Sequence, residues 1–285
     1  MGFELRLRQK SELDLRLEQK FGDFERDLWD TAEFQDIDIE NPKNAYHRDM
    51  LQAILLRSPE TGTSLIGQIL REQEDLREED IDKIIVESFQ FDDIDLDLGT
   101  KRNVDRVVLV CKDMRTLTMT VSIDKARVEN IYDSPTMQET NTIQEIKDPL
   151  LTWAVQKWYG TTVVKDGKGI RAVICKEYVP GTILNALTLD LEVAEMEYGE
   201  QFIRQVAYAV GKMIANVRAG FDGIPIDSNP FNIIIDTKDD GNITARYCDV
   251  ERILTEPQEM NREISLIKKE FGKYAEEVER GIKEG

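Results

Sequence analysis

The chain has 285 residues, a formal net charge of −19 and a hydrophobic fraction of 41%. This length fits one large domain or two modest ones, and the apolar fraction is normal for a globular protein. Such an excess of carboxylates argues against binding to nucleic acid or to anionic membranes, because both attract basic surfaces.

Cysteine and histidine usage restricts the chemistry further. Cys111, Cys175 and Cys248 are the three cysteines, each in an apolar run and without metal-ligand spacing, so we expect buried free thiols in a reducing cytoplasm. His47 is the single histidine, which excludes a histidine-cluster metal site and a histidine-based triad, and we expect it at the surface or as a cap. No apolar run is long enough to span a bilayer and the N-terminus is charged from Glu4 onward, so we expect neither a membrane span nor a signal peptide.

Residues 1–88 have the apolar spacing of helices and carry no motif of catalytic chemistry. The predicted helices cover 1–35, 45–56, the stretch around Leu65–Leu70 and the stretch around Ile81–Phe89. The first few residues alternate with a period of two and are also compatible with an extended segment. We expect a helical accessory or oligomerisation region over 1–88, through which a protein partner could bind.

From residue 89 the pattern changes to strands. An antiparallel meander is predicted at Phe91–Leu98, Val104–Cys111 and Thr116–Asp124, with a turn over Gly99–Asn103. A helix over 135–147 follows, with Pro135 near its first turn. Two more strands are predicted at Thr161–Val164 and Ala172–Cys175, and Pro180-Gly181 then turns the chain away from the sheet.

The strongest helical periodicity of the chain lies over 194–217. Its apolar residues recur at helical spacing and predict a core helix. A second, highly charged helix is predicted over 259–283. These two helices point to a second, mostly helical part after residue 180.

The segment Ile224–Arg252 carries the clearest chemistry. The run Ile233–Ile235, a turn rich in Asp, Gly and Asn, and a second apolar run predict a β-hairpin. The two ends of a hairpin meet, so Asn232 and Asp249 should lie side by side, with Asp227 on the loop that enters the first strand. Carboxylate and amide oxygens are ligands that Mg²⁺ prefers, and Mg²⁺ holds nucleotide phosphates. The other carboxylate would orient an attacking hydroxyl, so the segment predicts phosphoryl transfer. The alternative is a plain hairpin with acidic turns, since Asp, Asn and Gly are common turn residues for local reasons.

Two motifs resemble those of a known family. Asp227-Ser-Asn-Pro-Phe-Asn232, the strand after it and Asp249-Val-Glu resemble the catalytic loop and metal-binding segment of the protein-kinase-like superfamily. The match is closest to its small atypical members, such as aminoglycoside phosphotransferases and RIO-type kinases. Cys175-Lys-Glu-Tyr-Val-Pro-Gly181 resembles the hinge between the two lobes of that family.

The resemblance implies a two-lobed α+β fold over 89–285. An antiparallel-sheet small lobe would cover 89–179, and a minimal helical large lobe would cover 180–285. It also implies an enzyme that uses ATP and Mg²⁺ and moves the γ-phosphoryl group to a hydroxyl of a protein or small molecule.

The same resemblance assigns roles to individual residues. Asp227 would orient the acceptor, and Asn232 and Asp249 would hold Mg²⁺. Lys125, directly after the third strand, would reach the α- and β-phosphates; a solvated lysine at a strand end is the equal alternative. The carboxylate partner of that lysine would be Glu139 or Glu145. The backbone that would bind adenine belongs to Glu177, Tyr178 and Val179.

Three departures from the family pattern favour a different function. Pro225 stands where the family has a histidine, Glu251 stands where it has a glycine, and the first turn of the meander has only Gly99 in place of a glycine-rich loop. The alternative is therefore a pseudokinase, a non-catalytic scaffold that binds a protein partner.

Overall fold

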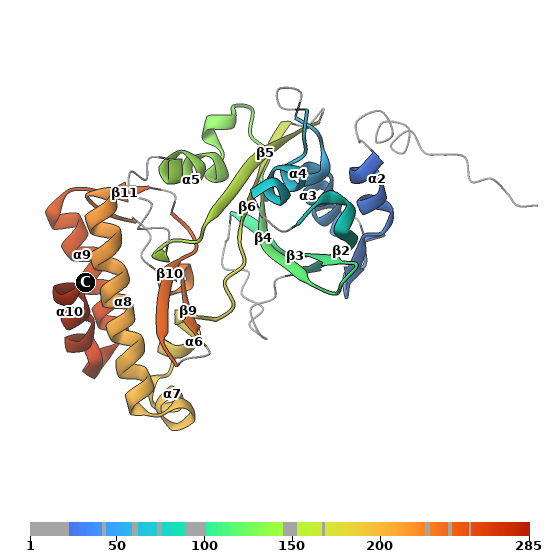
Figure 1. Cartoon of the computed structure of the whole chain (residues 1–285). Coiled ribbons are helices and arrows are strands. Elements are labelled where there is room, and N and C mark those ends of the chain that lie inside the picture. Colours follow the sequence, from blue (N-terminus) through green and yellow to red (C-terminus); the bar gives the residue numbers. More distant parts are fainter. Residues whose placement is uncertain are drawn as a thin grey trace, which may run out of the picture.

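The structure is a computed structural model of the chain. It describes residues 23–41, 44–58, 62–72, 76–88, 101–144, 153–166, 169–225, 229–238, 241–250 and 252–285. The fold is α+β: a six-stranded mixed sheet with flanking helices lies beside a mostly helical part that also contains a β-hairpin (Figure 1). No helix in these ranges is both long and apolar enough to cross a bilayer.

The large sheet has the strand order β1–β2–β3–β4–β6–β5. Its strands are β1 (Glu33–Gln35), β2 (Ile81–Ser88), β3 (Arg102–Cys111), β4 (Thr116–Asp124), β5 (Trp158–Asp166) and β6 (Gly169–Glu177). Neighbouring strands are antiparallel except β1 and β2, which are parallel. The four strands predicted within β3 to β6 are confirmed, whereas the one predicted at Phe91–Leu98 lies outside the described residues. β3 begins at Arg102, inside the stretch predicted as a turn.

The helix predicted around Ile81–Phe89 is wrong, because residues Ile81–Ser88 form β2. Ile84 and Val86 are both buried, as expected for alternating residues of a strand. The register of β2 against β3 shifts between Ile81 and Lys83. A bulge adds one residue to a strand, so the buried Ile81 and Ile84 stand three apart and imitate helical spacing. β2 is also hydrogen bonded to β3 across the domain boundary expected at residue 89.

One face of the sheet is covered by three helices. They are α2 (Asp23–Asp30), α3 (Ala45–Leu55) and α4 (Leu65–Glu72). The last two confirm the helices predicted at 45–56 and around Leu65–Leu70. In the region predicted as helix over 1–35, α2 ends at Asp30 and strand β1 follows, and residues 1–22 lie outside the described ranges. The helices and strands share one apolar cluster that includes Met50, Ile54, Ile69, Leu109, Val121 and Cys175.

His47 is a polar exception within this layer. The expectation of a surface or capping role is wrong, because the side chain is only 2% exposed and its Nδ1 lies 2.5 Å from Oδ2 of Asp105 on β3. His47 precedes the apolar stripe of α3 by three residues and therefore faces the sheet with it. The three cysteines are not in disulfides, and Cys111 and Cys175 are buried, as predicted, while Cys248 is half-buried.

The other face of the sheet is covered by α5 (Pro135–Gln144), which contacts β4, β5 and β6. Successive side chains of a strand point to opposite faces. In β4, Val121 and Ile123 therefore face α2–α4, while Asp124 faces α5 and bonds to it. The 3₁₀ helices that lie wholly within the described residues are η2 (Glu78–Asp80), η3 (Ile131–Asp133), η5 (Pro230–Asn232) and η6 (Gly272–Tyr274).

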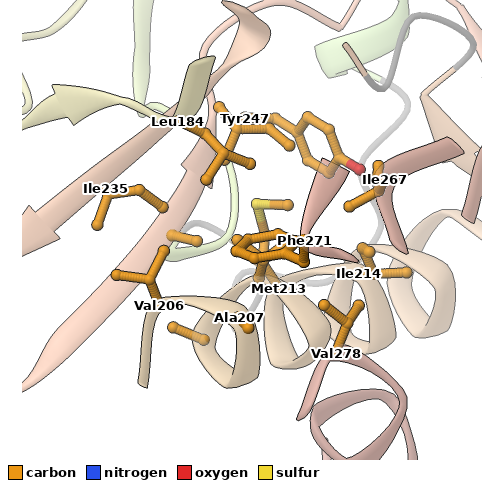
Figure 2. Close-up of a cluster of buried hydrophobic side chains, with 14 of the residues drawn as sticks. Leu184, Val206, Ala207, Met213, Ile214, Ile235, Tyr247, Ile267, Phe271 and Val278 are labelled. Carbon is orange, nitrogen blue, oxygen red and sulfur yellow. The ribbon is translucent and has the colours of Figure 1, made fainter. Parts of the chain in front are cut away.

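The rest of the chain packs around one long helix. The helices are α6 (Leu184–Thr188), α7 (Leu191–Tyr198), α8 (Glu200–Phe221), α9 (Pro257–Glu270) and α10 (Ala275–Glu284). The predicted hairpin is confirmed as β9 (Ile233–Thr237) and β10 (Ile243–Tyr247), β7 (Thr182–Ile183) adds to β9, and β8 (Ile224–Pro225) pairs with β11 (Ile253–Leu254). Figure 2 shows Met213 and Ile214 of α8 among Tyr247, Ile267 and Phe271, so α8 is the centre of a second apolar core.

Two predicted helices are each divided in the structure. The helix predicted from residue 194 is split at Gly199, whose φ of +87° belongs to a region that glycine adopts without strain. The helix predicted over 259–283 is divided by η6 between α9 and α10. Periodicity alone does not locate such breaks, because the apolar spacing continues on both sides.

Candidate functional site

The hairpin brings Asn232 and Asp249 to the same end of its two strands. Ile233 pairs with Tyr247 in the register of β9 and β10, and the N–H of Cys248 donates to the carbonyl oxygen of Asn232 at 2.9 Å. Asn232 ends η5 directly before β9, and Asp249 follows β10 by two residues. Asp249 is 30% exposed, so its carboxylate is accessible to solvent. Asp227 lies outside the described residues.

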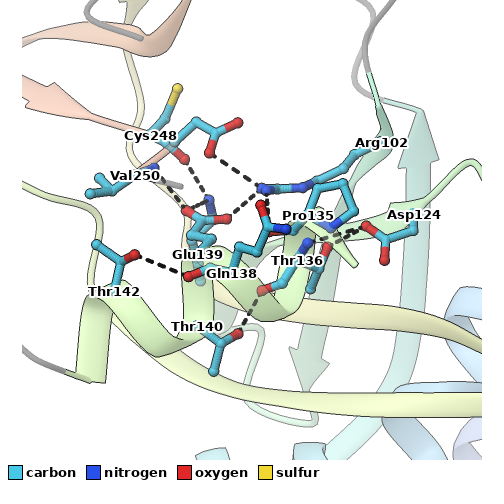
Figure 3. Close-up of polar contacts among 12 residues, drawn as sticks. Arg102, Asp124, Pro135, Thr136, Gln138, Glu139, Thr140, Thr142, Cys248 and Val250 are labelled. Atoms are coloured by element: carbon cyan, nitrogen blue, oxygen red, sulfur yellow. Dashed lines mark hydrogen bonds and ion pairs between the residues drawn. The ribbon is translucent and has the colours of Figure 1, made fainter. Parts of the chain in front are cut away.

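A buried charged cluster faces this end of the hairpin from the sheet. Glu139 of α5 is only 1% exposed, and Lys176 Nζ of β6 lies 3.0 Å from its Oε1. Arg102 Nη1 of β3 forms an ion pair with its other oxygen, Oε2 (Figure 3). Glu139 points inward because it belongs to the buried stripe of α5, which consists of Thr136, Glu139, Thr140 and Ile143.

Two cations hold Glu139 in its charged form. Burial alone would raise the pKa of this carboxyl, but the nearby charges of Lys176 and Arg102, with hydrogen bonds from Lys176 and the Val250 N–H, hold the pKa below its ordinary value. A buried carboxylate with two cationic partners is compensated, whereas the same carboxylate alone would be very costly. We therefore regard Glu139, Arg102 and Lys176 as one charged unit.

The cluster is joined directly to the exit of the hairpin. Lys176 Nζ donates to the carbonyl oxygen of Cys248 at 2.5 Å, and the Val250 N–H donates to Glu139 Oε1 at 3.4 Å. Arg102 Nη1 also lies 3.5 Å from Oδ1 of Asp249. Together with Asp249 the unit contains two positive and two negative side chains. Four distant segments of the sequence thus meet where the sheet and the helical part touch.

Asp124 fixes the helix that carries Glu139. Its buried carboxylate accepts hydrogen bonds from Ser134 Oγ at 2.5 Å, from Thr136 Oγ1 at 2.7 Å and from Thr136 N–H at 3.3 Å. A negative charge at a helix N-terminus is favourable, because the first N–H groups have no partners within the helix. Asp124 therefore positions α5, and with it Glu139, on the end of β4.

Lys125, the lysine singled out in the sequence, is exposed directly after β4. Its backbone N–H donates to the carbonyl oxygen of Lys101 at 2.8 Å, and its own carbonyl oxygen accepts from Arg171 Nη2 at 3.2 Å. The inward-facing carboxylate of α5 is Glu139, and Glu145 lies outside the described residues. The role of Lys125 toward phosphates stays a prediction.

The segment predicted as a hinge leads from β6 of the sheet to β7 beside the hairpin. The backbone of Glu177 is used within the protein: its N–H donates to the Lys157 carbonyl at 2.8 Å, and its carbonyl accepts from Gln156 Nε2 at 3.0 Å. Its carboxylate also accepts from Arg246 Nη1 of β10 at 2.9 Å. Both backbone groups of Glu177 thus have partners within the protein, and the role of this backbone toward adenine stays a prediction.

Tyr178 and Val179 follow in this connection. Tyr178 is half-buried and its hydroxyl accepts from Arg106 Nη1 at 3.4 Å, while Val179 is buried. A Cβ atom at Gly181 would lie 2.3 Å from the Ile235 carbonyl oxygen. Only glycine permits this close approach of the connection to the hairpin. β6 ends at Glu177 and β7 pairs with β9, so the chain leaves the large sheet just before Pro180-Gly181.

Asn232 and Asp249 bring oxygen donors of the type that Mg²⁺ prefers to the same end of the hairpin. Within the described ranges, no group of three or more His, Cys, Asp or Glu could hold a metal ion. Mg²⁺ does not need such a cage, because it usually keeps several waters and binds one or two carboxylates together with substrate phosphates. The accessible carboxylate of Asp249 and the amide oxygen of Asn232 are donors of this kind.

Sequence reasoning missed Arg102 and Lys176. Arg102 lies in the stretch that the sequence predicts as a turn. Its position opposite Asp124 follows only from the pairing of β3 with β4. Lys176 gave a weak signal, since it is the first charge after the apolar run Ala172–Cys175. A lysine that continues a buried strand needs a buried partner.

Comparisons with known proteins do not assign a family. No family model matches the sequence, and no curated protein is significantly similar to it. One similar solved structure is described as "WaaP in complex with acyl carrier protein"; it is 14% identical, with 63% of this chain and 75% of that chain covered and a TM-score of 0.43. A likeness this distant carries no argument about function, so the site has to be interpreted from its own contacts.

Proposed function

We propose that the chain is a kinase-like phosphotransferase that binds ATP and Mg²⁺ where the sheet meets the hairpin. The observation that carries the proposal is the contact of Asp249 with the charged unit of Glu139, Arg102 and Lys176. Phosphoryl transfer requires positioned cations and oxygen ligands rather than covalent help from the protein. This junction contains both.

The proposed division of roles follows from charge. Asp249 and Asn232 would hold Mg²⁺, which neutralises phosphate charge when bound. Arg102 and Lys176, oriented by Glu139, would supply positive charge toward the phosphates. When Asp249 serves as a metal ligand, Arg102 loses one of its anionic partners and its charge becomes available to a phosphate oxygen. Lys125 is the additional phosphate contact predicted from the sequence.

The remaining roles rest on the sequence pattern. Asp227 would orient the acceptor hydroxyl, as the motif Asp227–Asn232 implies. Adenine would bind the backbone at Tyr178 and Val179, since the backbone groups of Glu177 already have partners within the protein. The acceptor class, protein or small molecule, is open in this proposal.

A second candidate function, a non-catalytic scaffold, is favoured by one specific observation. Lys176 donates to both Glu139 and the Cys248 carbonyl, and Arg102 lies against Asp249, so the cations join the sheet to the hairpin without any ligand. In a scaffold these contacts would serve only to fix the two parts of the molecule. Nucleotide binding separates the two functions.

The first test is thermal unfolding of the full chain with and without ATP and Mg²⁺. The proposal predicts that the wild type is stabilised by several degrees, because a ligand that binds only the folded state raises its stability. Asp249→Ala should abolish this shift, and Asp236→Ala, a carboxylate on the same hairpin, should retain it. No shift in any of the three proteins would support the scaffold.

The second test separates binding from transfer. Asp227→Asn should retain the ATP-dependent thermal shift and lose Mg²⁺-dependent ATP turnover, measured as release of radioactive phosphate from γ-labelled ATP. Equal turnover in this variant and the wild type would contradict the role proposed for Asp227. A thermal shift without turnover in the wild type would indicate a nucleotide-binding scaffold.

A further inference from the structure

Exposed apolar side chains gather on one short segment of the helical part. Eight large apolar side chains are exposed among the described residues, and four of them fall within 189–198. These four define the α7 patch: Leu189, Val193, Met196 and Tyr198. Met196 is 88% exposed and Leu189 is 72% exposed. Single exposed apolar residues are normal on a protein surface, but a cluster of them marks an interaction surface.

The orientation of α7 accounts for this patch. Ala194 is buried and Leu191 packs against the core around α8. Glu195 is joined to Lys273 of η6 by an ion pair of 2.8 Å. These contacts fix the inner face of the helix. Val193 and Met196 are spaced by three residues and therefore share the outer face of α7. Leu189 is the C-cap of α6, directly before α7, and the ring of Tyr198 lies 5.3 Å from that of Phe202.

The patch is surrounded by carboxylates. Residues 177–203 contain no Lys, Arg or His, and the segment from 190 to 200 contains five acidic residues: Asp190, Glu192, Glu195, Glu197 and Glu200. Two of these form ion pairs, Glu195 with Lys273 of η6 and Glu200 with Arg204 one turn later in α8. Glu192 and Glu197 are exposed beside Val193 and Met196, so the apolar surface has a negative rim.

We propose that the α7 patch is a docking surface for a basic, amphipathic segment of a partner protein. Apolar side chains of the segment would cover Val193 and Met196, and its Lys or Arg side chains would meet the acidic rim. Charge disfavours a second copy of this chain, because two negative rims would then face each other. The same charge disfavours an anionic membrane.

The patch shares no residue with the proposed nucleotide site. α7 lies beside the N-terminus of α8, whereas β8 follows its C-terminus (Figure 1). The two surfaces are nevertheless neighbours in the fold, because α6, which directly precedes the patch, contacts the 3₁₀ helix η5 that ends at Asn232. The proposal does not depend on the phosphotransferase activity.

Fluorescence anisotropy with defined peptides tests this surface. The probe is a labelled 18-residue helical peptide of Leu and Lys with one apolar face, and the comparison peptide has Glu in place of Lys. The full chain should bind the Leu–Lys peptide and not the Leu–Glu peptide. The double variant Val193→Ser/Met196→Ser should weaken binding at least tenfold, while the control Met114→Ser/Leu266→Ser, two exposed apolar residues elsewhere, should bind as the wild type does.

A second pair of variants tests the rim. Glu192→Gln/Glu197→Gln should weaken binding several-fold more than Glu259→Gln/Glu270→Gln, which removes two exposed carboxylates from α9. Equal binding by patch and control variants would overturn the proposal, since attraction would then reflect only the overall negative charge. A dimer in sedimentation that only Val193→Ser/Met196→Ser dissociates would overturn the proposal in favour of a second copy of this chain. Binding to anionic vesicles that only this variant loses would overturn it in favour of a membrane.

Discussion

The two faces of the six-stranded sheet are covered in opposite ways. Toward α2–α4 the strands present Val121, Ile123 and other apolar side chains, and the His47–Asp105 pair is the polar exception in this layer. Toward α5 the layer contains Glu139, Arg102 and Lys176, which are buried and paired. Apolar packing tolerates changes of shape at modest cost, while a buried charge depends on each of its partners. The charged face is therefore where single substitutions should have the largest effects.

The largest loss of stability is expected from removing the shared anion. Glu139→Ala leaves Arg102 and Lys176 buried without their carboxylate, which should lower the free energy of unfolding by about 3–5 kcal/mol. Urea denaturation measures this, with Gln138→Ala, an exposed neighbour on the same helix, as the control. An equal change in both variants would mean that the buried ion pairs of Glu139 make no net contribution to stability.

A pH series should reveal the same carboxylate in the wild type. The pKa of Glu139 is lowered despite burial, because Lys176 and Arg102 favour its charged form. The stabilisation is therefore complete above the ordinary glutamate pKa of about 4.3 and is lost as the pH falls below it, toward the lower folded pKa. The stability difference between wild type and Glu139→Gln should shrink in that acidic range. A difference that stays constant from pH 7 to pH 3 would contradict this linkage.

Substitution of an apolar side chain on the face toward α2–α4 should cost less stability, and this cost should not depend on pH. Ile84→Val removes one methylene group from a fully buried side chain of β2 and should cost about 0.5–1.5 kcal/mol. The loss should be the same at pH 7 and at pH 4, in contrast to Glu139→Gln. Denaturation curves at the two pH values provide the measurement, and a pH-dependent loss would show that the two faces are coupled.

The smallest effect is expected at the α7 patch. Met196→Ser replaces a side chain that is exposed in the isolated protein, so its free energy of unfolding should stay within about 0.5 kcal/mol of the wild type. Chemical denaturation without any peptide checks this. A large loss would mean that α7 packs against the protein with its outer face, which would remove the basis for a docking surface.

The difference between the two faces also explains what the sequence could predict. Local patterns located α3, α4, β3–β6 and the β9–β10 hairpin, because apolar periodicity and turn residues act over a few positions. They failed at β2, where a bulge changed the spacing, and at Gly199, where periodicity continued through a break. The position of Asn232 beside the segment of Asp249 was predictable, because both flank one hairpin whose strands are close together in the sequence.

The charged unit could not be predicted in the same way. Arg102, Glu139, Lys176 and Asp249 come from four elements that meet only after the strands have paired and α5 has docked. Arg102 and Lys176 have no local sequence signal beyond their charge. The inward face of α5 was recognisable in principle, since Glu139 lies in register with the buried Thr136 and Ile143.

The central claim is that Asp249 binds a divalent ion together with a nucleotide. Mn²⁺ replaces Mg²⁺ at oxygen sites, and its complex with ATP enhances the relaxation of water protons when it is bound to a protein. We expect this enhancement with the wild type and with Asp236→Asn, and its loss with Asp249→Asn. Equal enhancement with all three proteins, or none with the wild type, would contradict the claim.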